Sequence, residues 1–268
     1  MDDRNLDLSS GFFEDFVAFL FDREVVKPDP PNEYVVADLL RIGGQYDAAI
    51  PSSPDTILGY MKKLFSEFGQ IAPRYSLSQI DQGIWNLLGE SLEIHSVLWD
   101  PSIPLESRLQ CIRSMYFVFR DFVAKSQVEE METCFYMWWD LLADAFWWQP
   151  KLYKAGVKPG EMSKLDGESR AVVDAMFETL ARILELPDSR TQDCALHGLG
   201  HLHHPAGRES VQKFIDKNRP ALAEHRLKWL EQCRDGTVIT PSTKYVTFIN
   251  GQRTGRGVRE NSSSPTWA

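Results

Sequence analysis

Residues 189–218 read SRTQDCALHGLGHLHHPAGRESVQKFIDKN and carry the clearest architectural signal in the chain. It consists of two short helical patterns that meet at His204-Pro205, where the proline interrupts the helix. The stretch also holds four of the six histidines in the chain. It therefore predicts a pair of packed helices, with histidines on the first one.

The order of residues here resembles a HEAT repeat of the short, phycobilisome-lyase type, over about residues 188–218. The resemblance implies that further helix pairs stack on this one, because a lone repeat cannot bury its apolar face. Small residues at positions 194, 195, 198 and 200 would let the first helix approach its neighbour closely. The residues that carry the resemblance are Asp188, Ser189-Arg190, Cys194-Ala195, Leu199-Gly200, Leu202, Ala206, Val211 and Phe214-Ile215.

Helical periodicity in the rest of the chain supports the same architecture. Eight to ten segments repeat apolar residues at helical spacing, among them residues 12–21, 33–42, 57–68 and 134–148. We therefore expect an all-α protein, either a HEAT-like α-solenoid or an irregular stack of helix pairs. Residues 238–249 form the only β-like run and are expected to be an extended C-terminal strap.

Two helices are predicted with particular features. Ser76 and Gln79 have the spacing of a capping box at a helix N-terminus. The longest regular pattern runs from Leu105 to Val123 and is expected at the centre of the core, with Arg108, Arg113 and Arg120 on its opposite face. Gly69 is expected to end the helix at residues 57–68.

The domain organisation follows from these patterns. We expect a single helical domain over residues 1–250, with a hinge near the polar, Gly- and Pro-containing residues 150–166. Residues 251–268 are expected to be a disordered basic tail.

Charge and cysteine usage limit the classes of partner and compartment. The net charge is −9, and residues 1–60 carry −8 of it, which argues against nucleic acid as a partner. The four cysteines form no C-x-x-C pair, as is typical of free thiols in a reducing compartment. The acidic N-terminus lacks the features of a signal peptide, and no segment is apolar enough to span a membrane. We expect a cytoplasmic protein.

Four residues form the sharpest chemical pattern. Asp193, His197 and His201 are spaced i, i+4, i+8, and His204 follows three residues later. Two histidines at i, i+4 lie on one helical face, a geometry that metal ions accept. The alternative interpretation is that these histidines are solvated near the end of the helix, where they favour the negative end of its dipole.

Residues 138–148, WWDLLADAFWW, hold a second set of candidates. Asp140 and Asp144 share one helical face, either as an exposed acidic ridge or as part of a metal site if they meet His197 and His201. Trp138 and Trp148 follow the predicted buried stripe. Trp139 and Trp147 fall off it, so they either contact a neighbouring helix on the far side as core residues or form, with Asp140 and Asp144, a binding surface for a partner.

No motif for a catalytic nucleophile, a nucleotide or another cofactor is found, so no cofactor is expected. The sequence favours a non-catalytic protein-binding or scaffold module whose acidic surface suits a basic protein partner, for example in neutralising a toxin. The alternative is a metal-dependent enzyme that uses Asp193, His197 and His201, with Asp140 and Asp144.

Overall fold

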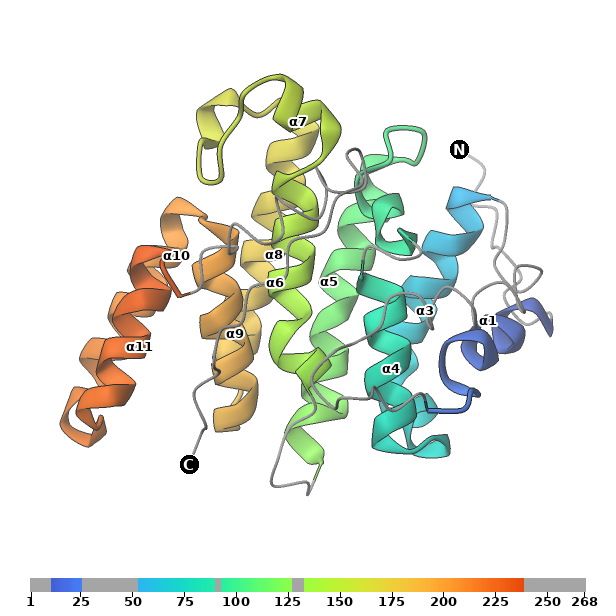
Figure 1. Ribbon diagram of the computed structural model, residues 1–268, viewed down its shortest axis with the longest axis horizontal. Coiled ribbons are helices and arrows are strands. Elements are labelled where there is room, and N and C mark those ends of the chain that lie inside the picture. Colours follow the sequence, from blue (N-terminus) through green and yellow to red (C-terminus); the bar gives the residue numbers. More distant parts are fainter. Residues whose placement is uncertain (1–10, 26–52, 90–92, 127–132, 239–268) are drawn as a thin grey trace, which may run out of the picture. The chain divides into compact units, whose positions relative to one another are not determined.

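The chain divides into two units, Met1–Val238 and Ile239–Ala268, and every described residue belongs to the first unit. The helix predicted at residues 33–42, the strap beyond Val238 and the tail at residues 251–268 lie outside the described part. The computed structural model describes residues 11–25, 53–89, 93–126 and 133–238 (Figure 1).

Every regular element in these residues is helical, which confirms the all-α prediction. No helix among them is long and apolar enough to cross a bilayer. The α-helices are α1 (Gly11–Phe21), α3 (Pro54–Ile71), α4 (Leu77–Leu88), α5 (Leu105–Asp121), α6 (Thr133–Trp147), α7 (Pro150–Lys154), α8 (Gly167–Leu184), α9 (Ser189–Leu202), α10 (Pro205–Asn218) and α11 (Glu224–Asp235). Short 3-10 helices are η2 (Ala72–Arg74), η3 (Ile94–Trp99), η4 (Val123–Lys125), η5 (Met162–Lys164) and η6 (Arg219–Ala221).

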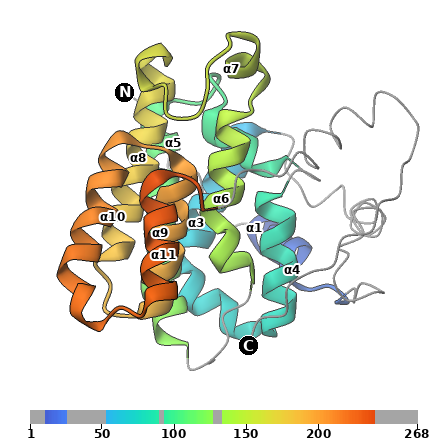
Figure 2. The same cartoon turned by 60° about the vertical axis from the view of Figure 1, so that its left-hand side comes forward.

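The long helices pack in two series (Figures 1 and 2). In one series α3 packs on α5, and α5 packs on α8. In the other series α4 packs on α6, α6 on α9, and α9 on α11. Helix α10 contacts α11, α9 and α8. Helix α9 therefore has neighbours on several sides, and its position determines which side chains meet its histidines.

Helix α5 lies in the core as predicted, with Leu109, Ile112 and Phe119 buried. Arg108, predicted on the opposite face, is instead buried, and only 2% of its side chain is exposed. Its Nε donates a hydrogen bond to the Ile103 carbonyl at 3.0 Å, and its guanidinium pairs with Glu168 of α8. Because α5 has helices on both sides, one of its arginines is enclosed and paired instead of solvated.

Gly69 does not end its helix, and the prediction there is wrong. Helix α3 continues to Ile71, and Pro73 lies in the 3-10 helix that follows. A Cβ at position 69 would lie 2.9 Å from the Asp121 carbonyl oxygen. The glycine therefore serves the close approach of α3 to the end of α5, not a helix cap.

Two predicted helix starts are confirmed. The Ser76 Oγ accepts a hydrogen bond from the Gln79 backbone N–H at 3.3 Å, and the Gln79 Oε1 accepts one from the Ser76 N–H at 3.0 Å. At the proline interruption, His203 adopts a left-handed conformation that ends α9, and His204 caps α10.

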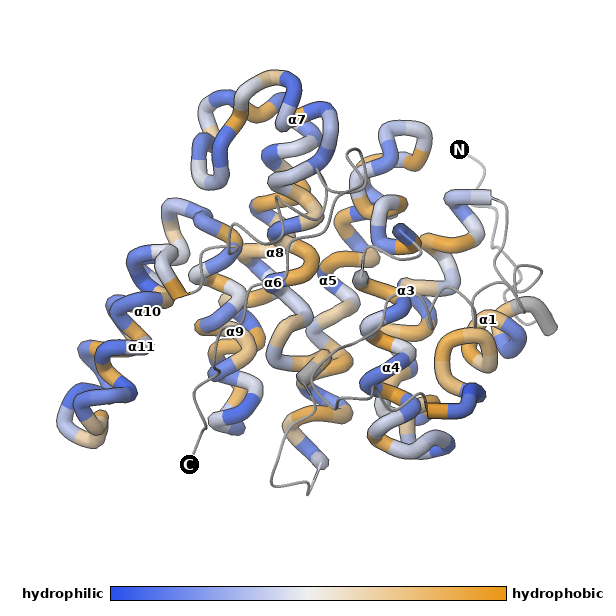
Figure 3. The backbone as a smooth tube through the Cα atoms, in the orientation of Figure 1, coloured by the Kyte–Doolittle hydropathy of each residue, from blue (hydrophilic) through white to orange (hydrophobic). Residues whose placement is uncertain are grey.

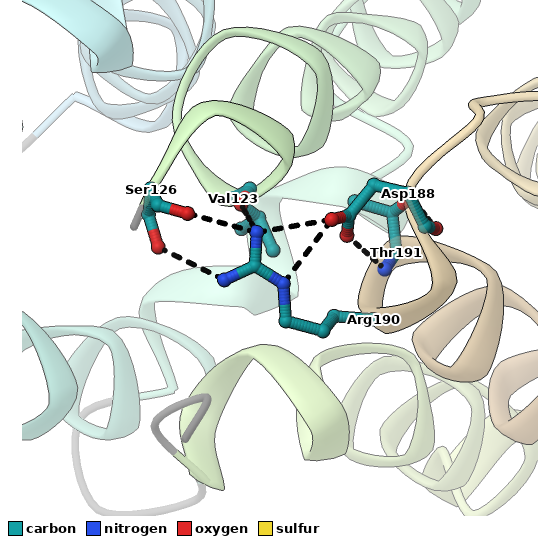
Figure 4. Close-up of polar contacts among 5 residues, drawn as sticks. All are labelled: Val123, Ser126, Asp188, Arg190 and Thr191. Carbon is teal, nitrogen blue, oxygen red and sulfur yellow. Dashed lines mark hydrogen bonds and ion pairs between the residues drawn. The ribbon is translucent and has the colours of Figure 1, made fainter. Parts of the chain in front are cut away.

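A half-buried group of polar side chains holds the start of α9 (Figure 4). The Asp188 carboxylate caps the helix by accepting from the Thr191 N–H at 3.0 Å. The Arg190 guanidinium donates to the carbonyl oxygens of Val123 and Ser126 at 3.0 and 2.9 Å, and also pairs with Asp188. These bonds tie α9 to the residues that follow α5.

Hydropathy varies along the series (Figure 3). Helices α10 and α11 are mainly hydrophilic, whereas α1 and α6 are mainly apolar. The buried positions of the last two helices are Gly207, Val211, Ile215, Leu230 and Cys233. The C-terminal end of the described part thus contributes a small share of the core.

Candidate metal centre

Three of the predicted site residues meet at the contact between α6 and α9. Asp140 comes from α6, and His197 and His201 come from successive turns of α9. One possible ligand atom from each residue lies within 4.8 Å of those from the other two. The sequence spacing placed the two histidines on one face, and the structure turns that face toward α6.

A glycine makes this contact close. A Cβ at Gly198 would lie 2.4 Å from the Trp139 Cβ in α6 and 2.8 Å from the Leu180 Cδ2 in α8. No side chain fits there without moving a helix, so glycine is required for the observed separation. The predicted role of a small residue at position 198 is confirmed.

Hydrogen bonds orient both imidazole rings. The His201 Nδ1 lies 2.8 Å from the Asp140 Oδ1. The His197 Nδ1 lies 3.2 Å from the Tyr136 carbonyl oxygen, and the two rings of these residues stack with centroids 4.1 Å apart. Within the described residues, the Nε2 atoms of His197 and His201 are buried and make no hydrogen bond.

The three residues are enclosed by protein. His197 is 0% exposed, His201 5% and Asp140 9%. Burial, and next the neighbouring His201, lower the pKa of His197 to about 4, so its ring is neutral near pH 7. The interpretations of solvated histidines and of an exposed ridge at Asp140 are therefore wrong, because α6 covers this face of α9.

The other predicted ligands lie elsewhere. The Asp193 carboxylate accepts from Arg226 of α11, with Nη1 to Oδ2 at 3.1 Å. The His204 Nδ1 accepts from the Ala206 N–H at 3.2 Å, and its Nε2 lies 3.0 Å from the Asp174 Oδ1. Asp144 is half-buried and is not a member of the three-residue group.

Trp139 and Trp147 do not form a binding surface, so that interpretation is wrong, and the alternative of core residues that contact a neighbouring helix is confirmed. Each is only 1% exposed, and the Trp147 Nε1 donates to the Leu202 carbonyl at 3.1 Å. Helix α6 contacts α4 on one side and α9 on another. Side chains outside the apolar stripe predicted from the sequence are therefore also covered by a neighbouring helix.

The exposed aromatic residues are Trp148 and Tyr153. Among the described residues they are the exposed large apolar side chains, at 44% and 68%, and their ring centroids lie 6.4 Å apart. Trp148 was predicted to be buried, but α6 ends at Trp147 and the next residue leaves its periodicity. No sequence signal marked Tyr153, which lies in the short helix α7.

Several lysines follow Trp148 closely in the sequence. Lys151, Lys154 and Lys158 are exposed in and after α7, and Lys151 pairs with Asp166. We define the residues Trp148, Tyr153, Lys154 and Lys158 as the aromatic–lysine surface.

The cysteines offer no nucleophile. All four are buried and none of them forms a disulfide. Burial raises the pKa of the Cys111 and Cys194 thiols well above the usual value, and raises that of Cys233 to about 12. Thiols in this state are protonated and unreactive near neutral pH.

Comparison with protein-family models, with curated proteins and with solved structures finds no match.

Proposed function

We propose that this chain is a non-catalytic protein-binding module that docks a partner on the aromatic–lysine surface. The observation that carries the proposal is the exposed pair of Trp148 and Tyr153. Aromatic side chains of this size lose much contact with water on binding, and Trp and Tyr are the residues most often decisive in protein interfaces.

The packing of the helices supports a HEAT-like architecture for this module. Helices α3, α5 and α8 follow one another in one series, and α4, α6, α9 and α11 do so in the other. Stacking of this kind is typical of α-solenoids, which serve mainly as binding surfaces. The stretch that resembles a HEAT repeat coincides with α9 and α10.

Charge at the aromatic–lysine surface favours an acidic segment of the partner protein. Lys154 and Lys158 are exposed and take part in no salt bridge among the described residues. The local charge of these lysines is positive, whereas the net charge of the whole chain is −9. The negative net charge suits a basic partner that binds elsewhere on the molecule.

The test is affinity capture from cells of the source organism, with quantitative mass spectrometry. We expect a partner that binds the wild-type chain and is lost with Trp148→Ala plus Tyr153→Ala, each removal weakening binding by about 2 kcal/mol. Lys154→Glu plus Lys158→Glu is expected to abolish the same binding.

Lys213→Glu plus Lys217→Glu is the matched control, because it makes the same charge change on exposed positions of α10. A partner that survives the aromatic substitutions, or that is lost equally with the control, would contradict the proposal. Direct titrations with a polyglutamate peptide and with a single-stranded oligonucleotide separate a protein partner from nucleic acid, since aromatic and basic residues also bind the latter.

The metal-dependent enzyme is favoured by one observation, the meeting of Asp140 with His197 and His201. Turnover requires that a substrate reach the ion, yet the three side chains are almost completely covered. The cluster is therefore better suited to a structural ion than to catalysis.

A further inference from the structure

We propose that Asp140, His197 and His201 bind one divalent transition-metal ion between α6 and α9, with an imidazole nitrogen of each histidine as a ligand. This inference goes beyond the binding function proposed above and does not depend on it.

The hydrogen bonds select the tautomer that a metal ion requires. The Tyr136 carbonyl oxygen can only accept, so the His197 Nδ1 beside it carries the proton. In the neutral ring, the Nε2 of His197 then offers a free lone pair. In its neutral form the His201 ring likewise donates from Nδ1 to the Asp140 carboxylate, and its Nε2 is then available.

A hydrogen-bond acceptor at the ring nitrogen that does not bind the metal is typical of metal-bound histidine. Ligating imidazoles usually donate their other N–H to a carboxylate or a backbone carbonyl, which orients the ring and raises its basicity. His201 has the carboxylate partner and His197 has the carbonyl partner. The cluster thus contains the ligands together with the groups that orient them.

Leaving the Nε2 atoms of His197 and His201 without a hydrogen-bond partner or a metal ion is unfavourable. A buried polar atom without a hydrogen bond destabilises the folded state because it loses its contact with water, and both Nε2 atoms are in this position within the described residues. A single cation near them satisfies both lone pairs, and the Asp140 carboxylate compensates part of its charge.

The ligand types select the class of ion. Imidazole nitrogens suit Zn²⁺, Co²⁺, Ni²⁺ and Cu²⁺, whereas Ca²⁺ and Mg²⁺ prefer sets made of oxygen atoms. Ligands bound at about 2.1 Å from one ion lie no more than about 4 Å apart. One possible ligand atom from each of the three residues already lies within 4.8 Å of those from the other two, so these atoms need to close by less than about 1 Å.

The experiment is a titration of the untagged, full-length protein with Co²⁺ and Zn²⁺, followed by absorption and by elemental analysis. We expect one ion per chain, visible d–d absorption with Co²⁺, displacement by Zn²⁺, and a higher melting temperature in the loaded protein. Mg²⁺ is expected to leave all of these readouts unchanged.

Variants assign the site. His197→Gln and His201→Gln are expected to abolish the one-to-one binding, and Asp140→Asn to weaken it about 10- to 100-fold. His225→Gln is the matched control, because His225 is exposed on α11 and outside the cluster. Retention of the site in the double His197→Gln, His201→Gln variant, or its loss in the control, would overturn the proposal.

A measurement on the wild-type chain covers the case in which a histidine variant does not fold. Long-range ¹H–¹⁵N NMR spectra report which nitrogen of each ring carries the proton. We expect His197 to be protonated at Nδ1 and its Nε2 resonance to shift when Zn²⁺ is added. An Nε2–H tautomer of His197, or a spectrum that one equivalent of Zn²⁺ leaves unchanged, would show that the cluster is a polar contact without an ion.

Discussion

His95 is a buried histidine that takes no part in the candidate metal centre. It belongs to η3, which contacts α3, α4, α5, α6 and α8, and it is only 5% exposed. Burial lowers the pKa of His95 from 6.5 to about 4, although a hydrogen bond with the Gly89 backbone opposes this shift. The native protein therefore keeps this ring neutral at a pH where the unfolded chain protonates it.

The stability of the fold should consequently fall with pH in a defined window. Between pH 6.5 and pH 4 the unfolded state binds a proton at His95 that the native state does not, so unfolding becomes easier as the pH decreases. At pH 4.5 the free energy of unfolding is expected to be about 2 kcal/mol lower than at pH 7.5 because of His95. Urea unfolding of the wild-type chain and of His95→Gln, at pH 7.5 and at pH 4.5, measures it.

The decisive quantity is the difference between the two proteins, because other groups also titrate in this window. His95→Gln is expected to be less stable at pH 7.5 but to lose less stability on acidification. Equal losses in both proteins would show that His95 is protonated in the native state.

At the scale of elements, α9 depends on glycine for its contact with two neighbours. The atom that a Cβ at position 198 would meet is the Trp139 Cβ, which cannot move without moving the backbone of α6. Gly198→Ala is therefore expected to destabilise the protein by about 1–3 kcal/mol, the usual cost of overpacking. It should also weaken Co²⁺ binding, because α6 and α9 carry the ligands.

Gly207 in α10 provides the matched control. Its Cβ would lie 3.6 Å from the nearest atoms, at ordinary van der Waals distance. Gly207→Ala is expected to be neutral or to stabilise the protein by up to about 1 kcal/mol, because alanine favours the helix. Thermal unfolding of both variants tests the pair, and similar destabilisation by both would contradict the role assigned to position 198.

The elements themselves could be predicted from local sequence, since the signals that form them are local. Ser76 with Gln79, and His204 with Pro205, specify helix ends through residues within a few positions of each other. The faces of a helix with several neighbours are not specified in this way. Periodicity marks one apolar stripe, whereas α6 and α9 are each covered on more than one side.

The candidate site also combines features that local sequence specifies with features that it does not. The i, i+4 spacing placed His197 and His201 on one face of a helix, but nothing local indicated that Asp140 on α6 would meet that face. Asp193 shares the spacing and nevertheless pairs with Arg226 of α11. Which carboxylate joins the histidines depends on the register between helices, and the long-range packing determines that register.

At the scale of the molecule, the interior helices of the series and its C-terminal helices differ in how firmly they are held. Helices α5 and α6 lie within the series and bury large apolar side chains on both sides. Helices α10 and α11 are hydrophilic over most of their surface and pack mainly on each other and on α9 (Figure 3). In stacked helical proteins each unit is stabilised mostly by its neighbours, so a terminal pair with a small interface opens first.

Native-state hydrogen exchange should reveal this order. We expect amides of α10 and α11 to exchange through an opening at least about tenfold more frequent than the one that exposes α5 and α6. Arg226→Gln removes the ion pair between α11 and Asp193 of α9 and should increase that opening while leaving α5 unaffected. Arg74→Gln, which breaks an exposed pair with Glu14 at the other end, should leave α11 unchanged. A single opening free energy shared by all helices would instead mean that the described part unfolds as one cooperative unit, and that its terminal helices are no weaker than its core.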